Sequence, residues 1–302
     1  MTRCFAKLFI LPLSLLILSG CEEEGKAPKQ PLTLDTVVVV KPKEIEIKYY
    51  FYPVEGIRTL TKLKEEFGPG GKKIILALNR LDSRNITRGD SLVVPDTIYD
   101  NIMLYSPFPK RVELLSRVKK LLIFSYSLQA FAAYEKGNLI RWGPTSLGKR
   151  STPTPTGLLH TNWKSKSTIS TIDSTWILPW AFNIDNFDGV SIHQFDLPGY
   201  PASHSCCRLL DTDAEWIYYW AEQWITTSDG EKIVAYGTPV IIYGKYDYKN
   251  PRPWKKLVAD SKANSLTKAD MKDIIEPYIE TIIRRAEKRD SVLAARQQNK
   301  KK

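Results

Sequence analysis

The residues best suited to chemistry lie in the short stretch "ASHSCCR", residues 202–208. It contains two adjacent cysteines, Cys206 and Cys207, and His204, while His193 lies thirteen residues before the first cysteine. A thiol is nucleophilic only as the thiolate, and a free cysteine has a pKa of about 8.5, so at neutral pH it needs a base or a cation beside it. A strand and a returning loop can bring His193 back against the sulfur. A cysteine with a histidine is the minimal machinery for covalent acyl transfer.

The adjacent cysteines indicate chemistry rather than a disulfide scaffold. A disulfide between neighbours closes a strained ring and joins no distant parts of a chain. Neighbouring side chains of an extended segment point to opposite faces, so the two sulfurs are not expected to reach one substrate. The residue types alone leave three readings open: Cys206 as nucleophile, Cys207 as nucleophile, or a redox-active pair.

The elements that must position this stretch are predicted to be mainly β over residues 118–250. Residues 136–138 form a turn between two runs rich in aromatic and branched side chains, which is typical of a hairpin. Residues 237–244, "GTPVIIYG", predict another strand, and turn-rich segments lie between them.

Several motifs in this region resemble, in order, those of L,D-transpeptidase catalytic domains of the YkuD type. That family carries a histidine, a loop that often reads L-P-G-Y-P-A, and then S-H-G-C-[IV]-R; this chain reads "IHQFDLPGYPASHSCCRL". Upstream, "SLGK" precedes "TPTPTG", which is similar to the family's T-P-x-G turn, and "GTPVIIY" is similar to the strand that closes the domain. The resemblance covers roughly residues 118–245 and implies a β-sandwich-like catalytic domain.

The resemblance also implies roles for individual residues. Cys206 takes the place of the nucleophile, His193 that of its proton acceptor, and Cys207 a packing position where a thiol acts as a small hydrophobe. Three residues depart from the family pattern: Ser205 replaces a glycine, Cys207 a branched aliphatic residue and Gln194 a small residue. Glycine adopts positive φ at no steric cost, so Ser205 is expected to strain or reshape the turn before the nucleophile.

The neighbours of the cysteine complete the implied site. The resemblance places Ser203 and His204 in the catalytic site, and the carbonyl of His204 or of a neighbour is expected to orient His193. Ser205 and Arg208 are expected at the substrate.

Residues near these motifs allow more than one interpretation. Arg208 would either hold a carboxylate of the substrate in a bidentate pair or tie down a loop acid such as Asp211 or Asp213. His160 follows the "TPTPTG" turn and is expected to be structural. Three tryptophans at helical spacing predict a core position: Trp216, Trp220 and Trp224.

The reaction implied by the resemblance is transfer on peptidoglycan. A Cys206 thiolate would attack the carbonyl of the third residue of a tetrapeptide stem, D-Ala would leave, and an amine would take the acyl group from the thioester. A diaminopimelate side chain as acceptor gives a 3→3 crosslink, and a protein lysine gives an anchored protein. Two alternatives remain: a carboxypeptidase or amide hydrolase of the same fold, and a wall-binding protein without catalysis.

The amino terminus predicts export and lipidation. Residues 1–20 have basic residues, an apolar run of about ten residues and a small-residue end, which is typical of a signal peptide. "LSGC" resembles the bacterial lipobox, with Cys21 as the lipidated residue; a plain signal peptide is the alternative. Residues 21–45 would form a tether, and removal of the leader lowers the formal net charge from +11 to +9. The expected location is the cell envelope, lipid-anchored in the periplasm, and Glu22 after the cysteine favours the outer membrane.

Residues 46–98 predict a small module with the order strand, helix, helix, strand. This order, with "LN" at 78–79 and "GDSLVVP" at 89–95, resembles a divergent LysM module, a family that binds N-acetylglucosamine chains. A structural mini-domain without sugar binding is the alternative, and residues 99–117 would connect the module to the catalytic domain.

Residues 251–302 predict a helical extension with a basic tail. Apolar residues recur at helical spacing, and Pro277 is expected to kink or restart the helix. One or two helices would cover the β domain, or a helix would hold a partner. No cofactor and no metal are expected, because three histidines and two adjacent thiols do not offer zinc spacing. The expected partners are peptidoglycan stems and glycan and a membrane through the lipid, with no nucleic acid.

Overall fold

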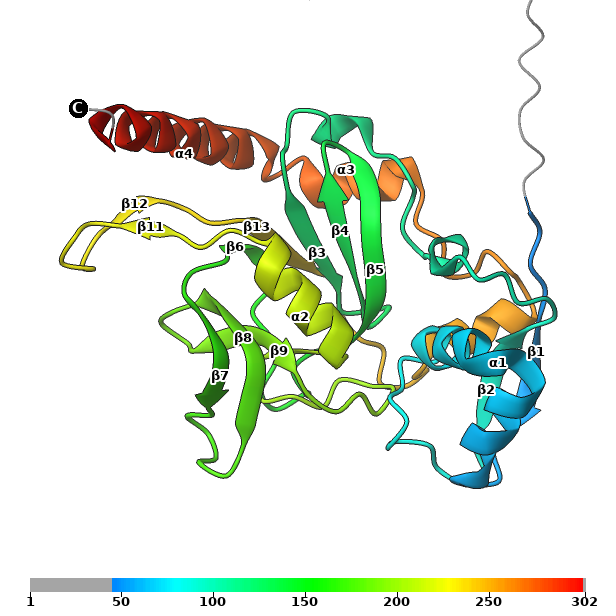
Figure 1. The fold of residues 1–302 in the computed structure, drawn as a ribbon. Coiled ribbons are helices and arrows are strands. Elements are labelled where there is room, and N and C mark those ends of the chain that lie inside the picture. Colours follow the sequence, from blue (N-terminus) through cyan, green and yellow to red (C-terminus); the bar gives the residue numbers. More distant parts are fainter. Residues whose placement is uncertain (1–44, 301–302) are drawn as a thin grey trace, which may run out of the picture. The chain divides into compact units, whose positions relative to one another are not determined.

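One curled sheet of nine strands forms the centre of residues 118–250, in the order β6-β13-β3-β4-β5-β10-β9-β8-β7 (Figure 1). The structure is a computed structural model, and it describes residues 45–300. The mainly β expectation is confirmed. The strands of this sheet are β3 Leu121–Ser125, β4 Ala130–Glu135, β5 Asn138–Ser146, β6 Gly157–His160, β7 Lys164–Ile169, β8 Ile177–Asp185, β9 Val190–Gln194, β10 Cys207–Leu209 and β13 Pro239–Tyr243.

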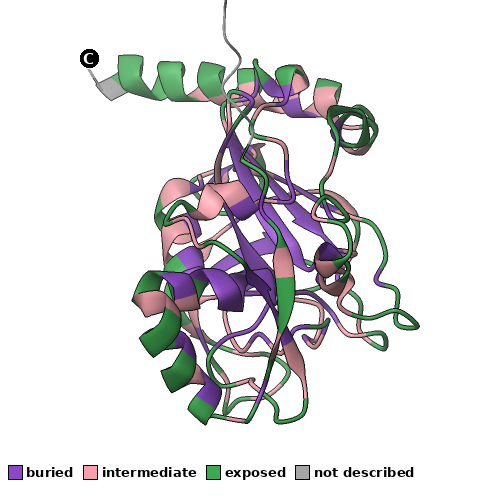
Figure 2. Cartoon of the chain, turned by 90° about the vertical axis from the view of Figure 1, so that its right-hand side faces the viewer, coloured by how far each residue is buried: buried purple, intermediate pink, exposed green. Residues whose placement is uncertain are grey.

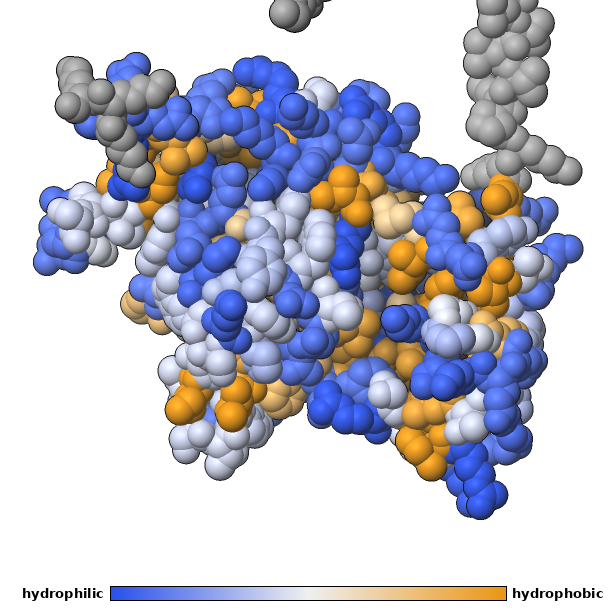
Figure 3. Space-filling model, viewed as in Figure 1, coloured by the Kyte–Doolittle hydropathy of each residue, from blue (hydrophilic) through white to orange (hydrophobic). Residues whose placement is uncertain are grey.

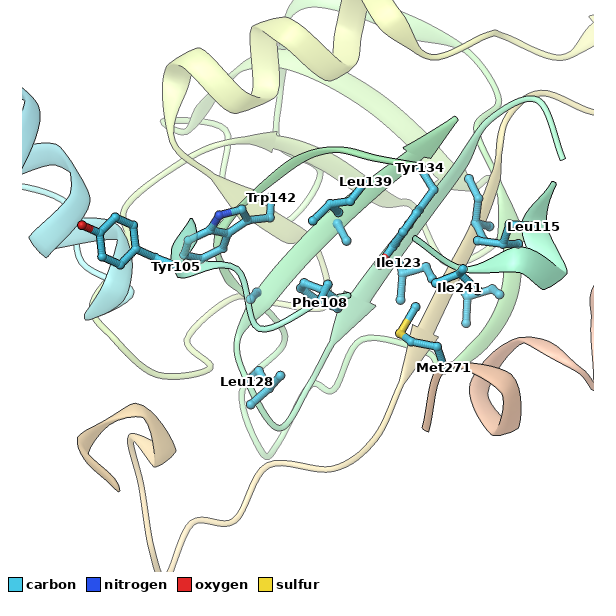
Figure 4. Close-up of a cluster of buried hydrophobic side chains, with 14 of the residues drawn as sticks. Tyr105, Phe108, Leu115, Ile123, Leu128, Tyr134, Leu139, Trp142, Ile241 and Met271 are labelled. Atoms are coloured by element: carbon cyan, nitrogen blue, oxygen red, sulfur yellow. The ribbon is translucent and has the colours of Figure 1, made fainter. Parts of the chain in front are cut away.

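The half of the sheet built on β3, β4 and β5 is largely buried. β3 and β4 form an antiparallel pair whose residues are almost all buried, and β13 runs parallel to β3 on its other side. The predicted hairpin between β4 and β5 is confirmed: Lys136 and Gly137 form a two-residue loop, both with positive φ, as a type I′ turn requires. Figure 4 shows Tyr134, Ile123 and Ile241 of these strands packed with Met271 in one core.

The other half, β7 to β10, carries the motifs of the candidate site. β8 pairs antiparallel with β7 and β9, and the three-residue β10 joins the halves by pairing with both β5 and β9. Helix α2 (Asp211–Trp220) follows β10 and packs beside β8 and β9. The short pair β11 (Ile225–Thr226) and β12 (Ile233–Ala235) lies outside this sheet.

The predicted order of the amino-terminal module is confirmed. β1 (Tyr49–Pro53) pairs antiparallel with β2 (Ser91–Pro95), and helix α1 (Arg58–Leu78) lies between them in sequence. Gly68 has φ 71° and ψ 174° inside α1, directly before Pro69, so the helix is broken into the two expected parts.

The carboxy-terminal extension is helical, as expected. The break expected near Pro277 separates α3 (Lys268–Ile275) from α4 (Ile279–Lys300). α3 begins with a capping box between Thr267 and Asp270 and buries Met271 in the core shown in Figure 4. The far end of α4 is exposed, in contrast to the purple strands of the sheet in Figure 2. Short 3₁₀ helices complete the fold: η1 Ile102–Tyr105, η2 Glu113–Leu115 and η3 Pro253–Val258.

Within residues 45–300, none of the helices is both long enough and apolar enough to cross a membrane. The predicted signal peptide, Cys21 and nearly all of the tether lie outside the described residues.

Candidate active site

His193 and Cys206 lie on one face of the sheet because β9 and β10 run parallel in register. His193 pairs with Arg208, and Ile192 pairs with Cys207. Side chains alternate along a strand, so Cys206 and Arg208 share the face of His193, while Cys207 shares the face of Ile192. Cys207 and Ile192 are both fully buried in one core cluster. Cys207 therefore occupies the packing position that the resemblance implies.

A cavity of about 300 Å³ opens on the face of His193 and Cys206. One wall comes from the turn between β7 and β8, which contributes Ser170, Ile172 and Trp176. Figure 3 shows apolar atoms gathered over the ends of these two strands, where the exposed residues include Ile169, Ile172 and Ile177. The lining residues of the cavity are Ser170, Ile172, Trp176, Leu178, His193, Phe195, Ser203, His204, Cys206 and Arg208.

His193 is a neutral imidazole with a free lone pair on Nε2. Its Nδ1 lies 2.8 Å from the carbonyl oxygen of Gln194, and a carbonyl only accepts, so Nδ1 carries the proton and donates it there. Burial lowers the pKa of His193 to about 4; the bond to Gln194 raises it and Arg208 lowers it further. The orienting carbonyl was expected at His204 or a neighbour. It belongs to Gln194 instead, because the ring turns toward the end of its own strand.

The resting state of Cys206 is the protonated thiol. Burial raises the pKa of this thiol, and the backbone N–H of Ser191 and the guanidinium of Arg208 oppose that rise. Within residues 45–300 no hydrogen bond joins the sulfur to His193, although both groups line one cavity. The pair is therefore a thiol and a neutral imidazole rather than a preformed ion pair. Catalytic hydrogen bonds often tighten only when substrate is bound.

His204 is held in the opposite tautomer. Its Nε2 lies 2.8 Å from the Lys149 ammonium, which only donates, so Nε2 accepts and Nδ1 carries the proton. Desolvation and then Lys149 lower the pKa of His204, which keeps the ring neutral. Nδ1 is buried and has no hydrogen-bond partner in the part of the chain that the structure describes. The Trp176 ring packs against His204 at 5.5 Å between centroids. The site thus contains one N–H donor with its hydrogen bond unmade.

Ser203 and Ser205 shape the turn that presents the sulfur. The buried Ser203 donates its Oγ proton to the Cys206 carbonyl oxygen at 2.5 Å, which fixes the backbone just before β10. Ser205 has φ 80°, in the left-handed region that favours glycine. The strain expected from a serine at the family's glycine position is therefore present, and Ser203 acts on the position of Cys206.

Arg208 presents an unpaired cation to the cavity. Burial lowers its pKa, while the carboxylate charge of Asp196 raises it. Among the described residues it forms no ion pair. The interpretation that Arg208 ties down Asp211 or Asp213 is wrong, because both acids have other partners. Asp211 accepts from Trp180 Nε1 at 3.0 Å, and Asp213 pairs with Arg141 at 2.7 Å.

Several residues of the cavity walls carry no signal in the sequence that would place them in the site. Phe195 lies under the Arg208 guanidinium at 4.4 Å and touches the His193 ring edge-on, so it fixes the direction of both. Trp176 comes from the far turn between β7 and β8. Lys149 belongs to the "SLGK" motif, but this motif does not indicate that the Lys149 ammonium reaches His204.

Two further predictions concern residues away from the cavity. His160 is buried and structural, as expected: it packs on Tyr236 and against Arg285. The prediction of one helical row of tryptophans is wrong at its end, because α2 stops at Trp220 where Ala221 becomes extended. The rings of Trp216 and Trp220 stack at 5.0 Å beside the core, and Trp224 lies beyond the helix.

No group of side chains within residues 45–300 has the composition and spacing to hold a metal ion. The candidate site consists of a thiol, two neutral imidazoles in opposite tautomers and one unpaired guanidinium. This set can transfer a proton from sulfur to nitrogen, hold an oxyanion or carbonyl oxygen, and hold a carboxylate.

Comparison with known proteins gives one family match and several similar solved structures. Residues 119–242 match the YkuD family, described as the L,D-transpeptidase catalytic domain. No curated protein matches the chain in sequence. Similar solved structures include an L,D-transpeptidase from Stackebrandtia nassauensis (20% identity, 42% of this chain and 57% of that chain, TM-score 0.35) and L,D-transpeptidase 1 from Mycobacterium tuberculosis (24% identity, 41% and 62%, TM-score 0.31). Another is an L,D-transpeptidase from M. tuberculosis H37Rv (20% identity, 52% and 73%, TM-score 0.33).

The match therefore spans less than two thirds of the length of the first two of these structures. The matched segment contains the whole cavity, from Ser170 to Arg208. The candidate site therefore lies entirely within the segment that matches the YkuD model of L,D-transpeptidase catalytic domains.

Proposed function

We propose that this chain is a cysteine L,D-transpeptidase that acts on tetrapeptide stems of peptidoglycan through a thioester on Cys206. The observation that supports this most directly is the parallel register of β9 and β10. It puts His193 and Cys206 on one face, in one cavity, with Cys207 buried on the other.

The acylation step uses the tautomer of His193. Its free Nε2 takes the proton of the Cys206 thiol as the sulfur attacks the carbonyl carbon of the third stem residue. A C–S bond forms and the carbonyl oxygen becomes an oxyanion. The imidazolium then gives its proton to the nitrogen of D-Ala, the C–N bond breaks, and D-Ala leaves with the thioester remaining on Cys206.

Transfer returns the enzyme to its resting state. An acceptor amine attacks the thioester carbon, its proton passes to His193, and the C–S bond breaks as the new amide forms. The expelled thiolate recovers a proton from the imidazolium. If water is the nucleophile instead, the same steps release a trimmed stem, so transfer and hydrolysis differ only in which nucleophile reaches the thioester.

Two groups of the cavity are suited to holding the substrate. We assign the unpaired Arg208 guanidinium to a stem carboxylate, since a guanidinium binds a carboxylate in a bidentate fork. We assign the unpartnered Nδ1–H of His204 to an oxygen of the stem. A donor aimed at developing charge is commonly worth about 3 kcal/mol in the transition state.

Labelling and product analysis test the proposal. The purified chain should take up the mass of a carbapenem on Cys206 at neutral pH and, with purified muropeptides, should release D-Ala and form dimers. Cys206→Ala should abolish both, while Cys207→Val, a matched change at the buried neighbour, should keep both. Trimmed stems without dimers would indicate hydrolysis. D-Ala release that survives Cys206→Ala would refute the thioester, and no reaction in the unaltered chain would leave a wall-binding protein.

We also propose that the chain is an envelope lipoprotein with its lipid on Cys21 and that its amino-terminal module binds glycan. The support is the sequence pattern "LSGC" and the strand-helix-helix-strand order of residues 46–98. Mass spectrometry of the amino-terminal peptide tests the lipid, with Cys21→Ala as the variant that should lack it. Co-sedimentation of Cys206→Ala with purified peptidoglycan tests glycan binding apart from catalysis.

A further inference from the structure

The turn after α1 in the module lies directly against the loop that precedes Ser203. This loop, residues 197–202, runs between the His193 strand and the Cys206 turn. Leu81 of the module forms an antiparallel bridge with Pro198 of the loop. The module is therefore in backbone contact with the segment between the proposed base and the proposed nucleophile.

Asp82 satisfies both backbone groups of Leu197. The Asp82 N–H donates to the Leu197 carbonyl oxygen at 3.1 Å, and the Leu197 N–H donates to Asp82 Oδ2 at 2.7 Å. Both residues are buried, so neither group can turn to water instead. The other carboxylate oxygen, Oδ1, accepts from the Arg84 N–H at 2.7 Å and from Asn85 Nδ2 at 3.0 Å. Both oxygens of Asp82 are thus in use.

The loop and the module turn also fit closely in shape. Gly199 has φ 80°, and a Cβ there would lie 3.1 Å from Leu81 Cδ2 and 3.3 Å from the Asn79 carbonyl oxygen. Only glycine suits both the backbone conformation and the close approach.

The module turn is itself rigid. The Asn79 side chain donates to the Ile75 and Val93 carbonyl oxygens and accepts from the Val93 N–H, which ties the turn to β2. Arg80 is buried between the rings of Trp142 and Trp254 and donates to the Leu128 carbonyl oxygen of the catalytic domain.

The other end of the loop is held by the catalytic domain alone. Ser146 Oγ donates to the Tyr200 carbonyl oxygen at 2.7 Å and accepts from the Ala202 N–H at 3.1 Å. The loop therefore has two supports: β5 holds the end nearest the nucleophile, and the module holds the end nearest the base.

We propose that Asp82 is a positioning residue, through which the amino-terminal module sets the active-site loop and so the approach of Cys206 to the substrate. This deepens the proposed function and rests on it. The module would then contribute to the reaction directly, in addition to any glycan binding. A misplacement of about 1 Å in a reacting group can cost about a hundredfold in rate.

The test compares Asp82→Asn with Lys255→Met in the purified full chain. Asparagine keeps the shape but has one oxygen, so it cannot serve both Leu197 and the Arg84 turn. Lys255 pairs with Asp90 at 2.8 Å and joins the module to the carboxy-terminal extension without touching the loop. The probe is acylation of Cys206 by a carbapenem, followed by mass, because a carbapenem contains no glycan and its reaction does not depend on glycan binding by the module.

We expect Asp82→Asn to lower the second-order rate of acylation about tenfold or more, with the hydrogen exchange of the Leu197 amide accelerated. Lys255→Met should stay within about twofold of the unaltered chain. If Asp82→Asn is acylated at the rate of the unaltered chain, the inference is overturned. An equal loss of acylation rate in Asp82→Asn and Lys255→Met would also overturn it, because any weakening of the contact between module and catalytic domain would then have the same effect. If Asp82→Asn does not fold, the second variant is Asp82→Glu, which keeps two carboxylate oxygens. Normal acylation of Asp82→Glu together with fast hydrogen exchange at the Leu197 amide would also overturn the inference. An unaltered chain that is never acylated refutes the proposed function instead.

Discussion

Two buried histidines of this chain have similar electrostatics and different neighbours. Burial lowers the pKa of His193 to about 4 and that of His160 to about 3, so both rings are neutral at pH 7. His193 lines the cavity of about 300 Å³ with Cys206, whereas His160 lines a larger cavity of about 560 Å³ beneath α4.

The difference between them lies in what each ring nitrogen can reach. The Gln194 carbonyl fixes the proton of His193 on Nδ1 and leaves Nε2 on the face of a thiol. His160 faces the Arg285 guanidinium at 3.2 Å and the Tyr236 ring, and no cysteine is described in its cavity. A lowered histidine pKa or a large cavity therefore does not distinguish the candidate site from the cavity of His160. The strand register that places a thiol beside His193 does.

The largest expected effect comes from the same substitution at both histidines. His193→Gln should lower the acylation rate of Cys206 by about 10²–10⁴-fold, because it removes the proton acceptor. His160→Gln should leave that rate within about twofold, since His160 makes no contact with the cavity of Cys206. Stopped-flow or mass-resolved labelling with a carbapenem measures both.

The comparison predicts that only the His193 substitution slows labelling. A large loss of labelling in His160→Gln would contradict it, provided that the variant still unfolds cooperatively. It would mean that the cavity beneath α4 takes part in the reaction. An unchanged rate in His193→Gln would assign proton transfer to another group, with His204 as the nearest candidate.

Acid should destabilise the fold through both histidines. Each has a folded pKa below its unfolded value of about 6.5, so the unfolded chain binds protons that the native chain does not, and stability falls as pH drops from about 6.5 toward 4. Each ring should contribute about 3 kcal/mol to this loss by pH 4. Denaturant unfolding at pH 7 and pH 4 measures it, and His160→Gln should lose about 3 kcal/mol less than the unaltered chain. Parallel losses in both proteins would mean that His160 is not buried as a neutral ring.

The sequence predicted those parts of the site that depend on neighbours in the chain. The alternation of Cys206 and Cys207 follows from an extended backbone, and the strain at Ser205 follows from a residue type at a turn. The hairpin at Lys136 and Gly137 has a local signal as well.

The contacts that could not be predicted join segments far apart in sequence. Lys149 reaches His204 across 55 residues, and Asp82 reaches Leu197 across 115 residues. Neither contact follows from periodicity or turn chemistry, because each depends on how the sheet curls and how the module docks. The end of α2 at Trp220 was also missed, since the apolar spacing continues to Trp224 after the backbone has become extended.

The smallest expected effect concerns the backbone at the two sites. Near His160, the residue with positive φ is a glycine, Gly157, whereas beside Cys206 it is Ser205, at φ 80°. Ser205→Gly should remove about 1–2 kcal/mol of backbone strain from the folded state. Glycine also gives the unfolded chain more conformational freedom, which offsets part of this gain, so the net stabilisation should be about 1 kcal/mol or less. Ser205→Ala keeps the Cβ and should not gain this stability. If denaturant unfolding shows the two variants to be equal, the backbone beside the nucleophile is relaxed, and this difference between the two histidine sites disappears.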